Sequence, residues 1–273
     1  MIEFYKMSGS GNDFIIIDNL DLSLDVGDLS EFARRICQRK FSVGADGLVI
    51  IEPSDAADFK WRFFNSDGSV AEMCGNAARC TARFAYMKGI VSNEMSWETI
   101  AGIISAEVQN DIAKVKLTDP SPVQSEVEIA TEGQKFILDI VDTGVPHAIA
   151  YVDDLDNYDV QTNGRKIRYH EYFSPRGTNA DFVTIIDRRN INLRTYERGV
   201  EGETLACGTG MVAAALTAAQ RGLVESPVDV LVMSGEKLRV YFENQNGLWR
   251  EIHLEGKVKI VYHGFLFEEA YKS

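Results

Sequence analysis

The sequence is poor in cysteine, in basic residues and in long apolar runs, and each shortage excludes a class of protein. Four cysteines in 273 residues are too few for a disulfide scaffold, and no Cys/His group has the spacing of a zinc site. The 28 Lys and Arg against 41 Asp and Glu leave a net charge of -13, which argues against a nucleic-acid or anionic-membrane partner. No apolar run reaches the roughly 18 residues of a membrane span, and residues 1–10 lack the layout of a signal peptide. We therefore expect a cytoplasmic protein with reduced thiols, no metal and a small-molecule ligand.

Nucleotide-binding motifs are also missing. Neither GxGxxG nor GxxxxGK[ST] occurs, so the glycine-rich stretch SGSGND at residues 8–13 does not predict a phosphate site. The composition, 45% hydrophobic and 25% charged, is that of an ordinary globular chain, and 273 residues are enough for one large domain or two of ordinary size.

Short apolar runs separated by turn residues predict a chain dominated by strands. Expected strands cover residues 2–7, 14–18, 47–52, 59–65, three segments of 97–117, 126–130, 134–141, 148–153, 181–187, 192–197, 228–233, 237–243, 250–256 and 257–267. Expected helices cover residues 31–39 after a Ser30 cap, 75–88, 160–172 and a segment that starts at 208. The polar stretch with two prolines at residues 118–125 is the best candidate for a linker, which divides the chain into residues 1–118 and 119–263.

Two of the expected helices begin with the same pair of residues. MCGNAARC at residues 73–80 and ACGTGMVAAA at residues 206–215 each place a Cys-Gly pair before a run of small residues. A helix that is apolar nearly all round is buried on most sides. The fold class predicted is therefore α+β, with two pseudo-symmetric domains, each a curled β-sheet or barrel around one central helix.

A cysteine at a helix N-terminus suggests chemistry as well as packing. Unpaired N–H groups and the helix dipole favour an anion there, so they can lower a thiol pKa or hold a carboxylate. Two such thiols, at Cys74 and Cys207, could invert a carbon, one removing its proton and the other supplying a proton on the opposite face. The alternative is that a buried Cys is simply a small apolar residue. Cys37 and Cys80, which lie within helices, keep that interpretation.

The chain resembles diaminopimelate epimerase over nearly its whole length. The motifs that carry the resemblance occur in the family's order: MSGSGNDFIIID, RKFSVGADGL, FFNSDGSVAEMCGNAARC, TGVPHAI, GTNADFV and YERGVEGETLACGTG. The resemblance implies an isomerase that converts LL-2,6-diaminopimelate to the meso form without pyridoxal phosphate or metal, in lysine and cell-wall peptide synthesis. It also implies that the tail 264–273 returns to the first domain. Because family members include dimers, a homodimer is an assembly to test.

Matched position by position, the family's pattern assigns roles to single residues. Cys74 and Cys207 match the catalytic thiols, and His147 with Glu197 matches groups that tune them. The remaining matches are to substrate-binding residues: Asn12, Asn65, Gly75, Asn76, Asn179, Glu197, Arg198, Gly208 and Thr209. Taken alone, Asn12, Asn65 and Asn179 could equally be turn formers, Glu197 and Arg198 a surface ion pair, and His147 structural.

Three positions depart from the family's pattern. Val145 stands where many members have Asn, and Gly47 where some have Gln, so the recognition of the distal end of the substrate is open. Ala77 replaces a Gly near the helix start and leaves the thiol chemistry untouched.

Two other functions remain as alternatives. A related cofactor-free enzyme, of the proline-racemase or phenazine-biosynthesis type, would act on a different substrate. A thiol-based redox or binding protein would use Cys74 for thiol exchange and would exchange no hydrogen on amino acids.

Overall fold

A computed structural model describes residues 1–131 and 133–272, which form two compact units. Unit 1 comprises residues 1–115 together with 255–272, and unit 2 comprises Lys116–Leu254. Among the residues described, none of the helices combines the length and the hydropathy of a membrane-spanning segment.

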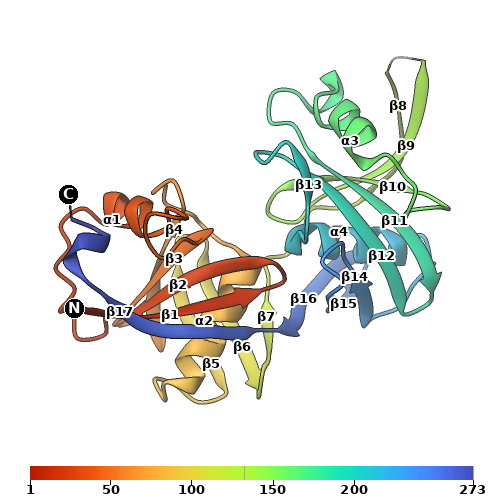
Figure 1. Cartoon of the computed structure of the whole chain (residues 1–273). Coiled ribbons are helices and arrows are strands. Elements are labelled where there is room, and N and C mark those ends of the chain that lie inside the picture. The colour runs from red at the N-terminus through yellow and green to blue at the C-terminus, as the bar shows by residue number, and fades with distance from the viewer. Residues whose placement is uncertain (132, 273) are drawn as a thin grey trace. The chain divides into compact units, whose positions relative to one another are not determined.

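Unit 1 is a mixed sheet curled around one helix (Figure 1). Its strands are β1 (Ile2–Gly9), β2 (Asn12–Asp18), β3 (Gly47–Glu52), β4 (Phe59–Asn65), β5 (Glu94–Thr99), β6 (Gly102–Gln109), β7 (Ile112–Lys116) and β17 (Lys259–Leu266). Its helices are α1 (Leu29–Ile36), α2 (Gly75–Met87) and the short η2 (Glu268–Ala270). The pairing runs β17-β1-β2-β3-β4-β5-β6-β7, parallel at β2–β3 and β4–β5 and antiparallel at the other pairs named in this unit.

Unit 2 has the same plan (Figure 1). Its strands are β8 (Gln124–Thr131), β9 (Gln134–Asp142), β10 (Pro146–Tyr151), β11 (Asn179–Asp187), β12 (Asn190–Glu197), β13 (Gly202–Thr204), β14 (Val228–Leu231), β15 (Lys237–Gln245) and β16 (Leu248–Lys257), which runs on to pair with β7. Its helices are α3 (Val160–Arg168), η1 (Glu171–Phe173) and α4 (Gly208–Gln220). Here the parallel pairs are β10–β11 and β12–β14.

The order of elements repeats between the units, which confirms the predicted duplication. The series β1, β2, α1, β3, β4, α2, β5, β6 in unit 1 corresponds to β9, β10, α3, β11, β12, α4, β14, β15 in unit 2. In both series a helix bridges each parallel pair, as a parallel connection requires. β8 pairs with β9 as β17 pairs with β1, so the flanking strand is also repeated.

The two Cys-Gly helices are the central ones. Each of α2 and α4 has 13 residues, of which nine are buried. α2 packs against β1, β2 and β6, and α4 packs against strands β9 to β12, β14 and β15. Each large apolar side chain that α4 buries, such as Leu216 or Met211, stabilises unit 2 by about 1.5–3 kcal/mol. These contacts fix the helix inside its curled sheet.

Several boundaries differ from those expected. Asp28 caps α1, not Ser30, because its Oδ1 accepts a hydrogen bond from the Glu31 N–H at 2.8 Å and the helix therefore starts at Leu29. The expected helix over residues 160–172 ends at Arg168, and β13 was not predicted because three residues are too few to show alternation.

The division of the chain also differs from the expected one. The chain enters unit 2 at Lys116 and returns to unit 1 at Glu255, so the returning segment is longer than residues 264–273. Residues 259–263 of β17 were assigned to the second domain from the sequence, but the whole strand pairs with β1 along Ile2–Ser8. An alternating pattern identifies a strand without saying which sheet edge it completes, which explains the error.

Candidate active site

Cys74 and Cys207 occupy equivalent places in the two units. Each is the N-cap residue of its central helix, with extended backbone angles of φ -148° and ψ 121° at Cys74 and φ -121° and ψ 110° at Cys207. Neither side chain caps its helix by a hydrogen bond. The first N–H groups of an α-helix have no intrahelical acceptor, so each terminus can bind an anion beside a thiol. The prediction that both cysteines begin a buried helix is therefore confirmed.

We call Cys74 with Asn12, Asn65, Gly75 and Asn76 the Cys74 half-site. Gly75 and Asn76 are the first two residues of α2, and Asn12 begins β2 at the tip of the first hairpin. The Asn76 carboxamide is buried and donates from Nδ2 to Asn12 Oδ1 at 2.7 Å. This bond connects the helix terminus to the hairpin tip, so two of the predicted asparagines act as one unit.

Both asparagines are oriented by charged neighbours. Asn12 Nδ2 donates to Asp46 Oδ2 at 3.1 Å, and Asn76 Oδ1 accepts from Arg79 Nη2 at 2.7 Å. Arg79 is fully buried, and the same Nη2 also donates to Ser10 Oγ at 2.8 Å. A carboxamide can present either end to a neighbour, and a guanidinium accepts no hydrogen bonds. Arg79 thus fixes which end of Asn76 faces Asn12.

Asn65 is not part of this network, because its hydrogen-bond partners are other residues. Its side chain is exposed and donates to Ser69 Oγ at 3.0 Å, inside the turn that follows β4. The Asn65 backbone N–H and carbonyl also bond within that turn, to Ser69 and Gly68. These contacts are those of a turn former, and a role in substrate binding stays a prediction.

The Cys207 half-site consists of Cys207, Gly208, Thr209, His147, Asn179, Glu197 and Arg198. His147, Asp181 and Thr195 stand on the adjacent strands β10, β11 and β12, and their side chains meet beside the start of α4. His147 Nδ1 lies 2.6 Å from Asp181 Oδ2, and Thr195 Oγ1 donates to Asp181 Oδ1 at 2.6 Å.

The other ring nitrogen of His147 faces the helix. His147 Nε2 lies 2.9 Å from Thr209 Oγ1, and that hydroxyl lies 3.5 Å from Cys207 Sγ. The three groups therefore form a continuous chain of hydrogen-bonding atoms from an imidazole to a thiol. His147 is fully buried, so its polar partners determine how the ring is held.

Asn179 connects His147 to the end of β12. Its Nδ2 lies 3.4 Å from His147 Nε2, and its Oδ1 accepts the backbone N–H of Arg198 at 2.7 Å. The Arg198 guanidinium donates from Nη1 to the carbonyl oxygen of Arg176 at 2.9 Å. The guanidinium has five N–H donors, so the others stay available for a carboxylate while this contact holds.

The electrostatics of Cys207 correct one expectation. Burial raises the pKa of its thiol well above the usual range, and the Glu197 and Asp181 carboxylates add to the rise. Hydrogen bonding between Cys207 and Thr209 and to the backbone N–H of Gly210 favours the thiolate and lowers the pKa, as predicted for a helix N-terminus, but burial and the carboxylates outweigh it. Cys207 is therefore a neutral thiol at pH 7 and not the thiolate that the helix dipole alone predicts.

Glu197 is itself perturbed. Burial raises the pKa of this carboxyl and repulsion from Asp181 adds to the rise, while a hydrogen bond with the Thr204 side chain and attraction to His147 oppose it. A half-buried acid beside a buried thiol makes the protonation state of the Cys207 half-site depend on pH and on any charged ligand.

Cys37 and Cys80 behave as core residues. Burial raises the pKa of each to about 12. Cys37 packs in the cluster around α1, and Cys80 lies one and a half turns into α2, fully buried. No disulfide joins the four cysteines, all of which lie in the described part of the chain.

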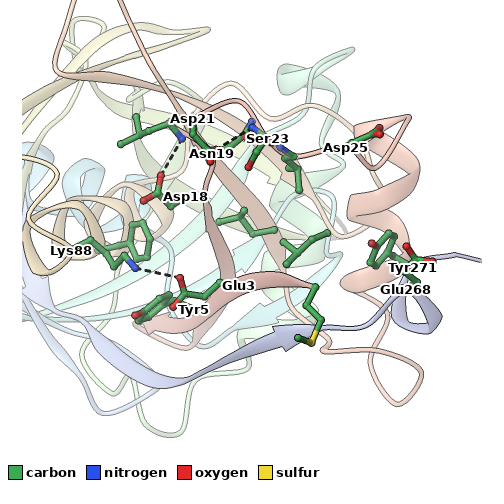
Figure 2. Close-up of a pocket in the computed structure, with 16 residues that line it drawn as sticks. Glu3, Tyr5, Asp18, Asn19, Asp21, Ser23, Asp25, Lys88, Glu268 and Tyr271 are labelled. Atoms are coloured by element: carbon green, nitrogen blue, oxygen red, sulfur yellow. Dashed lines mark hydrogen bonds and ion pairs between the residues drawn. The ribbon is translucent and has the colours of Figure 1, made fainter.

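Unit 1 also has a pocket of about 600 Å³ that is separate from these residues. Figure 2 shows its lining, in which Lys88 extends from the end of α2 toward Glu3 and Tyr5. The Lys88 Nζ atom lies 3.4 Å from Glu3 Oε2 and 5.2 Å from the centroid of the Tyr5 ring. None of the site residues predicted from sequence lines this pocket.

Sequence reasoning missed the residues that orient the predicted ones. Asp46 and Arg79 orient the asparagine pair, and Asp181, Thr195 and Gly210 surround His147 and Cys207. Side chains alternate along β11, so Asn179 and Asp181 lie on the same face. This spacing could have identified Asp181 as a neighbour of the site. Arg79 could have been singled out less clearly, as a charged residue in a helix predicted to be buried.

Comparison with known proteins identifies the family. The diaminopimelate epimerase family model matches residues 4–123 and 140–261. A diaminopimelate epimerase from Aquifex aeolicus is 47% identical over 279 residues, covering 98% of this chain and 99% of the relative, and one from Archaeoglobus fulgidus is 44% identical over 248 residues, covering 86% and 87%.

Solved structures show the same fold at low identity. A Bacillus anthracis phenazine biosynthesis protein of the PhzF family has a TM-score of 0.74 at 17% identity, over 97% of this chain and 99% of that one. A probable proline racemase from Agrobacterium radiobacter has a TM-score of 0.70 at 16% identity, over 98% and 93%. These likenesses establish the α+β fold of two similar units, whereas the sequence comparisons go further: the chain belongs to the diaminopimelate epimerase family.

Proposed function

We propose that this protein interconverts LL-2,6-diaminopimelate and meso-2,6-diaminopimelate, in the synthesis of lysine and of peptidoglycan precursors. Membership of the family supports the substrate. The observation that carries the chemistry is the placement of Cys74 and Cys207 at the N-caps of two matching central helices. Inversion of a carbon needs a proton acceptor on one face and a proton donor on the other, and the duplicated fold provides one thiol for each task.

The reaction needs no cofactor in this account. One cysteine, as thiolate, takes the α-proton and becomes a thiol, while the bonding electrons stay on the α-carbon. The other cysteine, as thiol, gives its proton to the opposite face and becomes a thiolate. Protons and charge balance, and each turnover exchanges the protonation states of the two cysteines.

The helix termini make the proton removable. An α-proton is far less acidic than a thiol, so the negative charge that develops on the carboxylate must be stabilised. The N–H groups of Gly75 and Asn76 and those of Gly208 and Thr209 are the first in their helices, where the dipole favours negative charge. Fixed donors of this kind act without reorganising during the reaction, and a site that excludes water strengthens their effect.

Substrate selection rests on the polar side chains near the helices. The Asn12–Asn76 pair and Asn179 offer donors and acceptors without net charge, which suits an ammonium and a carboxylate together. Arg198 can bind a second carboxylate through two nitrogens. The alternative substrates of this fold, such as proline, have no second amino-acid head for Arg198 to bind.

We also propose a cytoplasmic homodimer. The acidic net charge of -13 fits neither a nucleic-acid nor a membrane surface, and the substrate belongs to cytoplasmic amino-acid synthesis. Light scattering on the purified protein at several concentrations tests the assembly, and a mass of one chain at all of them would overturn the dimer.

The experiment that tests the activity is an incubation with LL-diaminopimelate in D2O. The protein is first dialysed against a metal chelator and receives no cofactor. We expect meso product with one deuterium at the inverted α-carbon, detected by NMR and mass spectrometry. Deuterated proline in a parallel incubation would favour the racemase alternative, and disulfide exchange without any deuterated amino acid would favour the redox alternative.

A further inference from the structure

The carboxylate of Asp181 is placed to control the imidazole of His147. Asp181 is fully buried on β11, and its two oxygens are both engaged, Oδ1 by the Thr195 hydroxyl and Oδ2 by His147 Nδ1. Since a carboxylate can only accept hydrogen bonds, Nδ1 of His147 must carry the proton that lies between them. The opposite nitrogen, Nε2, then has a lone pair when the ring is neutral.

The neighbours of Nε2 are donors, which agrees with this tautomer. The Thr209 hydroxyl lies 2.9 Å from Nε2, and the Asn179 amide nitrogen lies 3.4 Å from it. The oxygen of Thr209, having donated its proton to Nε2, keeps lone pairs that can accept from the Cys207 thiol at 3.5 Å. The donors and acceptors are therefore consistent along the whole chain: Cys207 donates to Thr209, Thr209 to His147 and His147 to Asp181.

We propose that Asp181 is a positioning residue that holds His147 with its proton on Nδ1, so that the Thr209 hydroxyl links Nε2 to the Cys207 thiol. The expected effects on kcat rest on the proposed function. The tautomer of His147 and the hydroxyl bridge of Thr209 do not depend on which substrate binds.

The bridge gives Cys207 a route for its proton. The Thr209 hydroxyl takes the thiol proton as it passes its own proton to Nε2. Cys207 becomes a thiolate and His147 an imidazolium, and the net charge of the network is unchanged. The imidazolium faces the Asp181 carboxylate at 2.6 Å, which stabilises it in a site without water contact. Cys207 can therefore alternate between donor and acceptor although burial and Glu197 favour its neutral form.

Gly210 shows how closely this arrangement is packed. A Cβ added at Gly210 would lie 2.7 Å from Asp181 Oδ1, 3.3 Å from Thr195 Oγ1 and 3.3 Å from Cys207 Cβ. The first turn of α4 thus leaves no room for a Cβ beside the Asp181 carboxylate, and a glycine fits there without displacing it.

The tautomer is tested on the resting wild-type protein by 15N NMR of its histidine rings. The chain has four histidines, and a His147→Gln sample identifies the signals of His147. We expect a neutral ring protonated on Nδ1, or an imidazolium whose Nδ1 proton resonates far downfield. A ring protonated on Nε2 alone would overturn the proposal whatever the protein catalyses.

The bridge is tested by Thr209→Val, which removes the hydroxyl and keeps the backbone N–H. We expect kcat to fall about a hundredfold with KM nearly unchanged, and Thr209→Ser to recover most of the loss. Asp181→Asn should lower kcat similarly and change the His147 spectrum. Thr217→Val is the matched control, because Thr217 is a buried hydroxyl on the same helix that accepts from Tyr151 at 2.9 Å.

The outcomes separate this inference from the proposed function. A wild-type protein without epimerase activity but with His147 protonated on Nδ1 contradicts the function and leaves the arrangement standing. Full kcat in both Thr209→Val and Asp181→Asn, in an active wild type, overturns the inference and leaves the function standing.

Discussion

Asn76, at the second position of α2, donates a hydrogen bond to Asn12 at the tip of the first hairpin, with Nδ2 and Oδ1 2.7 Å apart. The two residues are 64 positions apart in sequence. Their contact joins a helix terminus to a loop, and Arg79 and Asp46 hold it from either side. Asn12 and Asn76 thus belong to one connected network and are not independent asparagines, while Asn65 lies outside it.

The first prediction is that Asn12 and Asn76 contribute to substrate binding as a pair. Replacing either by Ala should raise KM about tenfold, because each loss removes one hydrogen-bonding partner and disorders the other. The double variant should cost little more than one single variant, giving a coupling energy of about 1 kcal/mol in a double-mutant cycle on kcat/KM. Strictly additive effects would show that the two asparagines act separately.

The second prediction concerns the protonation of Cys207. Glu197→Gln removes a carboxylate that raises the pKa of this thiol, so the pKa should fall. The rate of Cys207 alkylation by iodoacetamide, followed by peptide mass spectrometry across pH, should then rise at lower pH than in the wild type. Glu203→Gln is the matched control, because Glu203 pairs with Arg194 at 2.6 Å. An unchanged alkylation profile in Glu197→Gln would contradict the electrostatic account.

The third prediction concerns stability in alkali. Burial raises the pKa of Cys80 to about 12, above the value of 9.0 for an ordinary cysteine, so the folded state holds a proton that the unfolded state loses. The resulting stability is fully present below pH 9.0 and is lost as pH rises toward 12. Urea unfolding should show that Cys80→Ala, and likewise Cys37→Ala, reduces the alkaline loss by about 1.4 kcal/mol per pH unit. Identical slopes in variants and wild type would count against burial as the cause.

The fourth prediction compares two glycines that lie in helices. Ala normally stabilises a helix relative to Gly by about 1 kcal/mol, yet both sites should lose stability. A Cβ at Gly164 would lie 2.4 Å from Tyr196 Cβ, and one at Gly210 would lie 2.7 Å from Asp181 Oδ1. Thermal melting should show a lower Tm for Gly164→Ala and Gly210→Ala. Only Gly210→Ala should also lower kcat of the folded protein, because only its Cβ displaces Asp181. The same kcat in both variants would show that the position of Asp181 does not affect the reaction.

Much of this fold could be predicted from sequence because its strongest patterns are local. The Cys-Gly pairs before runs of small residues located α2 and α4, and their lack of a polar face showed that both are buried. The strands followed from alternation and turn residues. For β17, only the residues from 264 onward were expected beside the first domain, since the pairing of the whole strand with β1 depends on which edge is open after the rest of unit 1 has folded.

The site was predictable only in part for a similar reason. The reacting residues stand in recognisable motifs, but the residues that orient them are ordinary when considered alone. Asp181 is one acid among 41 acidic residues, and its importance comes from neighbours on β10 and β12 that only the register of the sheet brings beside it. The raised pKa of Cys207 had the same origin, because burial and two carboxylates outweigh a helix terminus that the sequence did show.

The central claim, that two thiols exchange the α-proton, is tested most directly by LL-diaminopimelate turnover in D2O with single cysteine variants. Cys74→Ala and Cys207→Ala should each lower formation of meso product by at least about a hundredfold, since each removes one proton carrier. Cys80→Ala, which changes only a core residue, should retain epimerisation and deuterium incorporation. Wild-type rates in either Cys74→Ala or Cys207→Ala would contradict the two-thiol mechanism.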